Sequence, residues 1–180
     1  AEANKRLLDE LIPEKVPMDL LLSVLRLLLE ERVSIRNLPL ILEAIAEGRG
    51  LGNPEAVCEH VRHRLGFQLV AELKRPDGTI PLIQLAPEWE KTFALYQIDG
   101  ERGARDVALP PDQFSKLANG LADRLNRAAE GGTFPALVTS TLRRRFLRTV
   151  LGAKGLTAPV LSYEEIGLEA RPAMVGVVPP

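Results

Sequence analysis

The sequence has few cysteines and few aromatic residues, and it has no excess of basic charge. A single cysteine, Cys58, excludes an intrachain disulfide and fits a reducing cytosol. With aromatics at 4% and hydrophobic residues at 46%, the core must be built from aliphatic side chains, chiefly leucine. Lys and Arg number 23 against 24 Asp and Glu, and this balance argues against a dedicated nucleic-acid binder.

Long hydrophobic runs are also missing. The longest apolar block, residues 18–29, is interrupted by Asp19, Ser23 and Arg26, whereas a transmembrane helix needs roughly 20 apolar residues in succession. Charged residues occupy much of the first ten positions, which is not the pattern of a signal peptide. The chain starts at Ala1 in a sequence that already has a helical pattern, so we expect it to be a piece of a longer protein.

Residue sets that support catalysis or cofactor binding are absent from the sequence. Cys58, His60 and His63 are the only Cys and His residues, one short of the four ligands of a structural zinc site. The glycine-rich stretch at 48–54 matches neither the P-loop nor the dinucleotide fingerprint. We therefore predict no enzyme activity, no metal, no cofactor and no small-molecule substrate.

Residues 1–75 have the periodicity of a small helical bundle. Apolar residues three and four positions apart predict helices that begin near residues 7, 17, 37 and 53. Two proline-containing starts, Asn37 to Pro39 and Asn53-Pro54, combine a capping side chain with a proline in the first turn. The predicted core includes Leu25, Leu28, Ile41, Leu42 and Val61.

The link between the second and third helices, "RVSIRN", is unusually polar. Arg32, Ser34, Arg36 and Asn37 lie within six residues, although capping the third helix needs only Asn37. The surplus donors can pair with glutamates of the same chain, or they can face another molecule. We keep both interpretations.

From residue 76 the pattern changes to alternating strands and helices. Strands are predicted at 80–85, 136–138 and 159–163, with helices at 111–130 and 141–151, which gives a β-α-β-α-β subdomain over residues 76–166. The Pro-Asp-Gly turn at 76–78 predicts a hairpin between residues 69–73 and 80–85. Residues 99–108 are expected to form a loop, and 167–180 an extended tail. The predicted fold class is therefore α+β.

The stretch "TLRRRFLRTVL" is the densest basic segment. If Leu142, Phe146, Leu147 and Val150 face inward, the arginines face outward. Such a face is either simply solvated or a docking surface for an acidic protein partner. The outward residues are Arg143, Arg144, Arg145 and Arg148.

A winged helix-turn-helix is the main alternative reading of residues 1–85. Its recognition helix would span 38–47, which contains Glu43 and Glu47 but no basic residue. Residues 1–75 hold 11 Lys and Arg against 12 Asp and Glu, a net charge of −1. Because phosphate contacts dominate affinity for DNA, this alternative is disfavoured.

Several stretches carry a resemblance to a known family. "LLLEERVSIRNLPLILEAIAE", "VRHRLGFQL", "IPLIQLAPEWE", "PALVTSTLRRRFLRTVL" and "PVLSYEEI" occur in the order found in the FlhA/InvA (FHIPEP) family, the large export-gate membrane proteins of bacterial type III secretion. The chain resembles the C-terminal cytoplasmic region of these proteins. The "VLSYEEI" ending favours the flagellar branch, with the injectisome branch as the alternative.

This resemblance implies a binding platform rather than an enzyme. The bundle would be the third cytoplasmic subdomain, through which subunits pack into a ring of nine, and the α/β part would be the fourth. Implied partners are other copies of the chain, flagellar export chaperone–substrate complexes, the stalk protein of the ATPase complex and other export-gate membrane proteins. The location would be the cytoplasmic face of the bacterial inner membrane, with the membrane region N-terminal to this chain. Interface candidates are Arg32, Ser34, Arg36, Asn37, Arg143, Arg144 and Arg148.

Overall fold

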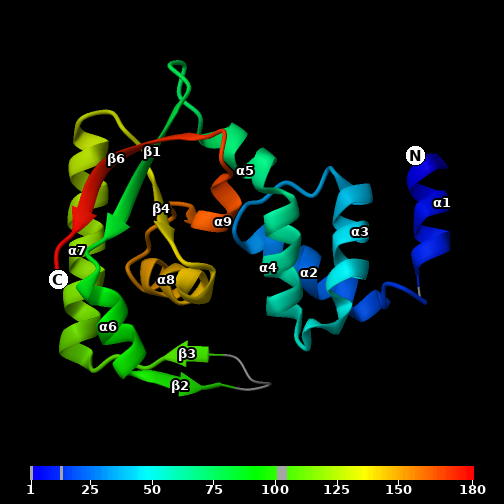
Figure 1. Ribbon diagram of the computed structural model, residues 1–180, viewed down its shortest axis with the longest axis horizontal. Coiled ribbons are helices and arrows are strands. Elements are labelled where there is room, and N and C mark those ends of the chain that lie inside the picture. Colours follow the sequence, from blue (N-terminus) through cyan, green and yellow to red (C-terminus); the bar gives the residue numbers. More distant parts are fainter. Residues whose placement is uncertain (1, 13, 101–104) are drawn as a thin grey trace. The chain divides into compact units, whose positions relative to one another are not determined.

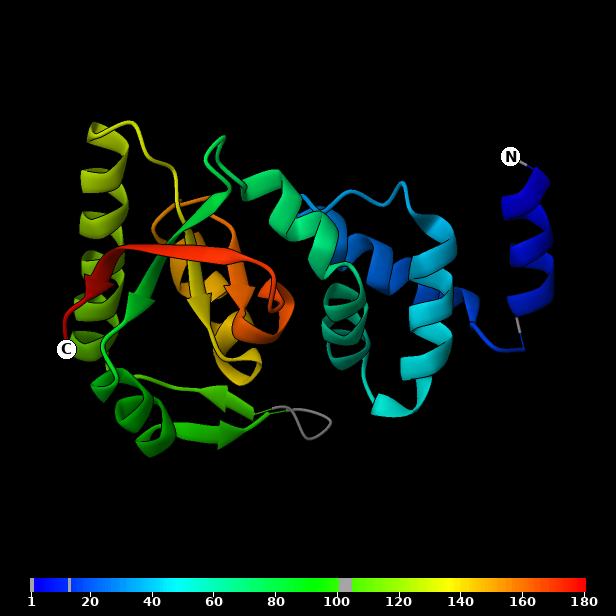
Figure 2. The same ribbon diagram turned by 45° about the horizontal axis from the view of Figure 1, so that its top comes forward.

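The computed structural model describes residues 2–12, 14–100 and 105–180, and these form two compact units, residues 1–69 and 70–180. Figures 1 and 2 show the helical first unit and the sheet-containing second unit. The predicted boundary at 75/76 lies a few residues beyond the division, which falls inside one helix, α5 (Gly66–Leu73). Each unit is described by itself below.

The first unit is a bundle of short helices, as its periodicity predicted. It contains α1 (Glu2–Leu11), α2 (Met18–Glu30), α3 (Leu38–Gly48), the 3-10 turn η1 (Arg49–Leu51), α4 (Pro54–Arg64) and the start of α5. Asn53 caps α4 by accepting from the Ala56 N–H at 2.8 Å. No helix in the described residues is both long and apolar enough to cross a membrane.

The core of the first unit lies between α2, α3 and α4. Leu28, Ile41, Leu42 and Val61 are fully buried, as predicted. Leu25 is only half-buried, so its assignment to the core was wrong. α2 is apolar on two faces, and the face that turns inward carries Leu21, Val24 and Leu28. The leucines on the other face, Leu22, Leu25 and Leu29, remain accessible.

The second unit is built on a four-stranded parallel sheet in the order β5-β4-β1-β6. The strands are β1 (Thr79–Leu85), β4 (Ala136–Thr139), β5 (Val160–Ser162) and β6 (Arg171–Val178). Helices α7 (Pro111–Glu130) and α8 (Thr141–Ala153) form the crossovers from β1 to β4 and from β4 to β5. The predicted β-α-β-α-β order and the α+β class are therefore confirmed. Ile83, Leu117, Leu137, Leu147 and Val160 belong to one buried cluster.

The segment predicted to be an extended tail contains the edge strand β6. It pairs in parallel with β1 along its whole length, after the short helix α9 (Tyr163–Ile166). Its end is held at two points: Ala86 N–H donates to Val178 O, and Trp89 Nε1 donates to Pro179 O at 2.8 Å. The prolines in "RPAMVGVVPP" led to the prediction of an extended tail without a strand, but Pro172 lies on an edge strand, where proline is tolerated.

Two further local predictions were wrong. Residues 69–73 belong to helix α5, so they form no hairpin with β1, and the wing required by the DNA-binding alternative is missing from the described residues. The loop predicted at 99–108 overlaps two short antiparallel strands, β2 (Gln97–Asp99) and β3 (Arg105–Val107). These strands follow helix α6 (Glu88–Leu95). Part of the loop predicted at 99–108, residues 101–104, lies outside the described residues.

Candidate interaction surfaces

The polar link after α2 is first of all a helix terminus. Arg32 has φ of +60°, the one described non-glycine residue with a positive φ. Val33 N–H donates to Leu28 O at 2.9 Å and Arg32 N–H donates to Leu29 O at 3.0 Å. These two bonds form a Schellman motif, in which the left-handed position is usually glycine. The bend therefore keeps an arginine where the backbone favours glycine.

The side chains of Ser34 and Asn37 play smaller local roles than predicted. Ser34 Oγ accepts from Arg36 N–H at 3.3 Å, and Ser34 O accepts from Gln68 Nε2 at 3.1 Å. Asn37 occupies the N-cap position of α3, but its side chain makes no capping bond. Its ψ of 59° departs from the extended conformation that aims a capping side chain at the helix. The prediction of a side-chain cap by Asn37 was wrong.

The two arginines of the bend are exposed to solvent. Within the described residues, no hydrogen bond or ion pair engages the guanidinium of Arg32 or Arg36. Glu31, the residue before Arg32, lies 3.9 Å from Nη1 of Arg62, a nearly buried side chain on α4. The bend thus presents two free cations outward.

Beside the bend, the outer face of α2 forms an apolar groove of about 550 Å³. Leu22 and Leu29 are each 54% exposed, which is high for leucine in a bundle. Ile35, from the bend itself, closes the groove. An accessible apolar surface next to free charge is the composition expected of a protein-binding site. The lining residues are Leu22, Leu25, Arg26, Leu29, Glu30 and Ile35.

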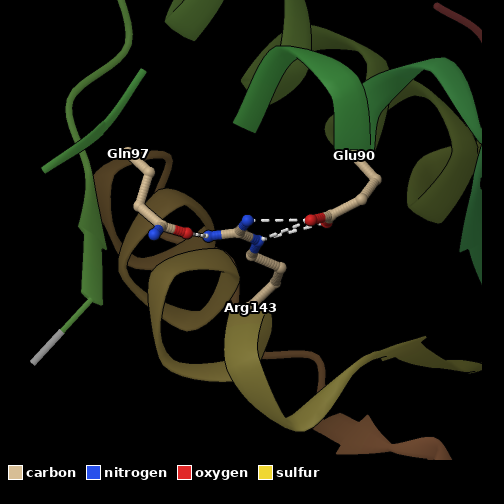
Figure 3. Close-up of polar contacts among 3 residues, drawn as sticks. All are labelled: Glu90, Gln97 and Arg143. Atoms are coloured by element: carbon tan, nitrogen blue, oxygen red, sulfur yellow. Dashed lines mark hydrogen bonds and ion pairs between the residues drawn. The ribbon is translucent and has the colours of Figure 1, made fainter. Parts of the chain in front are cut away.

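In the second unit, the predicted basic face is largely buried. Arg143 is 2% exposed, and its guanidinium lies between α6 and β2 (Figure 3). Arg143 Nε and Nη2 donate to the Glu90 carboxylate, with the shortest separation at 2.8 Å. Arg143 Nη1 donates to Gln97 Oε1 at 2.8 Å. This bidentate arrangement fixes three elements to one another.

Arg144 and Arg148 also serve the fold. Arg144 is fully buried and donates to Val160 O at 3.1 Å, while Arg148 is half-buried and points its Nη1 at Leu156 O and Ala158 O. The prediction that Arg143, Arg144 and Arg148 face solvent was therefore wrong. Residues 143, 147 and 150 share one helix face at i, i+4 and i+7, so the first arginine of the run must turn inward.

A smaller polar cluster joins α3 to α4. Glu47 accepts from Arg64 and lies 2.9 Å from His60 Nε2. The hydrogen bond from Arg64, reinforced by the one from His60, lowers the pKa of Glu47 below its ordinary value. The described residues contain no group of three or more metal-ligating side chains.

Known proteins resemble this chain along nearly its full length. Residues 1–171 match the FHIPEP family. The chain is 38% identical over 178 residues to the flagellar biosynthesis protein FlhA of Caulobacter vibrioides, which covers 98% of this chain and 25% of the relative. The chain thus spans about a quarter of the length of that relative.

Two solved structures share the fold. The nonameric SctV-C of EPEC, determined by cryo-EM, superposes with a TM-score of 0.81 at 18% identity, covering 98% of this chain and 56% of that one. The CdsV protein of Chlamydia pneumoniae, in its complex with CdsO, gives a TM-score of 0.79 at 24% identity, covering 98% of this chain and 51% of that one.

Proposed function

The chain belongs to the FHIPEP family, and from that premise we propose that it is the ring-forming cytoplasmic platform of a flagellar type III export gate. It receives export substrates with their chaperones and the stalk of the ATPase complex, and it adjoins the other membrane proteins of the gate at the inner membrane. It acts by binding, not by catalysis. The observation that carries the flagellar assignment is 38% identity with a flagellar FlhA over 98% of the chain. An injectisome gate is the second candidate, supported by the fold shared with SctV-C.

Assembly rests on the first unit in this proposal. The groove on α2 and the bend residues Arg32 and Arg36 supply an apolar surface with free cations beside it. A ring needs a heterologous contact, in which one patch meets a different patch on the next copy. The ring of the related SctV-C has nine copies, and we assign the same number here.

The test uses the full-length protein in its own bacterium. We expect Leu29→Glu and Arg36→Glu to reduce ring assembly and filament formation, because one buries a charge in the groove and the other reverses a free cation. The isolated 180-residue chain should melt normally with either change. Arg127→Glu reverses an exposed arginine on α7 that is ion-paired with Asp123; it is the control for charge reversal away from the bend and should leave rings intact.

The comparison variant is Leu42→Ala, which should cost about 2–5 kcal/mol because Leu42 is fully buried. If Arg36→Glu unfolds the isolated chain as strongly as Leu42→Ala does, the bend is structural and the assembly part of the proposal is wrong. If both groove variants keep rings and filaments, the groove is not the contact. If the variants stop secretion of an injectisome substrate but leave flagellar filaments intact, the injectisome candidate is favoured.

A further inference from the structure

The outer edge of β6 is unpaired. β6 is the last strand in the order β5-β4-β1-β6, so one row of its backbone N–H and C=O groups has no ladder partner in the described sheet. The strand is eight residues long. Three apolar side chains along it, Met174, Val175 and Val177, are between 42% and 45% exposed.

This edge carries only part of the usual protection against strand addition, namely Arg171 and Pro172 at its start and a bulge at Val175. Edge strands are commonly blunted by charged side chains, above all lysine. Residues 172–180 contain no charged side chain. The one irregularity is a register shift between Leu82 and Ile83, which leaves Val175 as the extra residue of β6. From residue 173 onward the strand is apolar and uncharged, so this part of the edge is a template for a further extended segment.

A cation without a full set of partners lies over the same strand. The Nε of Arg124, on α7, is buried and has no hydrogen-bond acceptor in the described structure. Asp123 Oδ2 is 3.9 Å away, beyond hydrogen-bond distance. A Cβ at Gly176 would lie 3.9 Å from both Cβ and Cδ of Arg124, so the arginine stem crosses β6 where the strand has no side chain. Buried donors are normally satisfied, and because the Arg124 side chain as a whole is 30% exposed, an incoming carboxylate could complete its hydrogen bonding.

We propose that the free edge of β6 binds an extended segment of a protein in transit, which adds as a fifth strand and presents a carboxylate to Arg124. Backbone hydrogen bonds supply sequence-tolerant affinity, and the apolar side chains of β6 favour an uncharged, β-prone segment with one acidic residue. A second copy of β6 is a poorer occupant, since residues 172–180 offer no acidic side chain. The identity of the segment rests on the proposed export function, whereas the binding chemistry does not.

The probe is a dye-labelled, end-capped peptide of about seven alternating Thr and Val residues with a central Glu, a typical strand length. Fluorescence anisotropy is measured on the 180-residue chain, with the same peptide carrying Gln as the matched control. We expect the Glu peptide to bind about tenfold tighter than the Gln peptide, the scale of one charged hydrogen-bonded pair. Arg124→Gln should remove that difference and leave the Gln peptide's affinity unchanged.

Strand addition has its own signature. Peptides N-methylated at alternate residues are made in the two possible phases, and only the phase that blocks the N–H groups facing β6 should abolish binding. Equal binding of both phases, or an unchanged Glu preference in Arg124→Gln, would overturn the proposal. Concentration-dependent dimerisation that Val177→Lys abolishes would identify a second copy as the occupant and also overturn it. The peptide assay does not depend on ring assembly. A negative result would therefore overturn strand addition without contradicting the proposed function, which is tested separately.

Discussion

Arg143 Nη2 lies 2.8 Å from Glu90 Oε1, yet the arginine side chain is 2% exposed and the glutamate side chain is 56% exposed. The pair therefore joins a buried cation to an anion that water also reaches. Removing Arg143 and removing Glu90 should therefore destabilise the fold by different amounts, because water can solvate an unpaired Glu90 but not an unpaired Arg143.

We predict that Glu90→Ala destabilises the chain by about 2–3 kcal/mol, since it leaves the buried Arg143 with Gln97 alone. Arg143→Met should cost less, about 1 kcal/mol, because Glu90 is released to solvent and the apolar chain fills much of the space. Urea unfolding of both variants and of the double variant gives the coupling energy. An Arg143→Met variant less stable than Glu90→Ala would contradict this reading.

The second prediction concerns the left-handed backbone of Arg32. Arg32→Gly should stabilise the chain by roughly 0.5–1 kcal/mol, because glycine adopts a positive φ without the steric penalty of a Cβ. Arg36→Gly is the matched control, because Arg36 does not have a positive φ. This variant should not stabilise the chain. Thermal melts of the isolated chain compare the two. Equal effects would mean that charge, rather than backbone conformation, decides the result.

The third prediction follows from the lowered pKa of Glu47. A carboxyl whose pKa is lower in the folded state stabilises the fold above its unfolded pKa, and that contribution disappears as pH falls through the folded pKa. The stability difference between the wild-type chain and Glu47→Gln should therefore be present at pH 7 and smaller at about pH 3. Urea unfolding at both pH values measures it. A difference that grows on acidification would show that the Arg64 and His60 bonds do not stabilise the ionised form.

The fourth prediction concerns the hydrogen bond from Trp89 to the end of β6. Trp89→Phe keeps an aromatic ring but removes the donor to Pro179 O, so the cost should be about 1 kcal/mol. Amides of β6 should exchange with solvent faster than in the wild-type chain, while those of α3 keep their protection. Uniform acceleration in both units would indicate global destabilisation and not release of the strand.

Much of the architecture was predictable because it depends on local patterns. The apolar periodicity of α4 and α7 and the Asn53 cap are encoded within a few residues of one another. The three strands β1, β4 and β5 were found because short β-prone runs separate long amphipathic helices. β6 was missed because its pairing partner, β1, is remote in the sequence and because Pro172, Pro179 and Pro180 resemble the prolines of a loop.

The candidate sites were harder to predict, because helix faces in this chain are ambiguous. In α2, apolar residues on two faces left the choice to tertiary packing, which buried Val24 and exposed Leu29. In α8, arginine was assigned to solvent by residue type, although the position of Arg143 relative to Leu147 and Val150 puts it on the inward face. Its partner Glu90 lies in a segment whose structure the sequence left open, so the pair itself had no sequence signal.

The place of β6 in the sheet sets the order in which this protein can be completed during synthesis. β1 leaves the ribosome long before residues 171–178 are made, so its edge stays unpaired while β4 and β5 are added on the other side. A nascent chain that stalls after β5 carries an open apolar strand edge, which is prone to aggregate. The residues of β6 therefore close the sheet, and the second unit cannot complete its fold until they have left the ribosome.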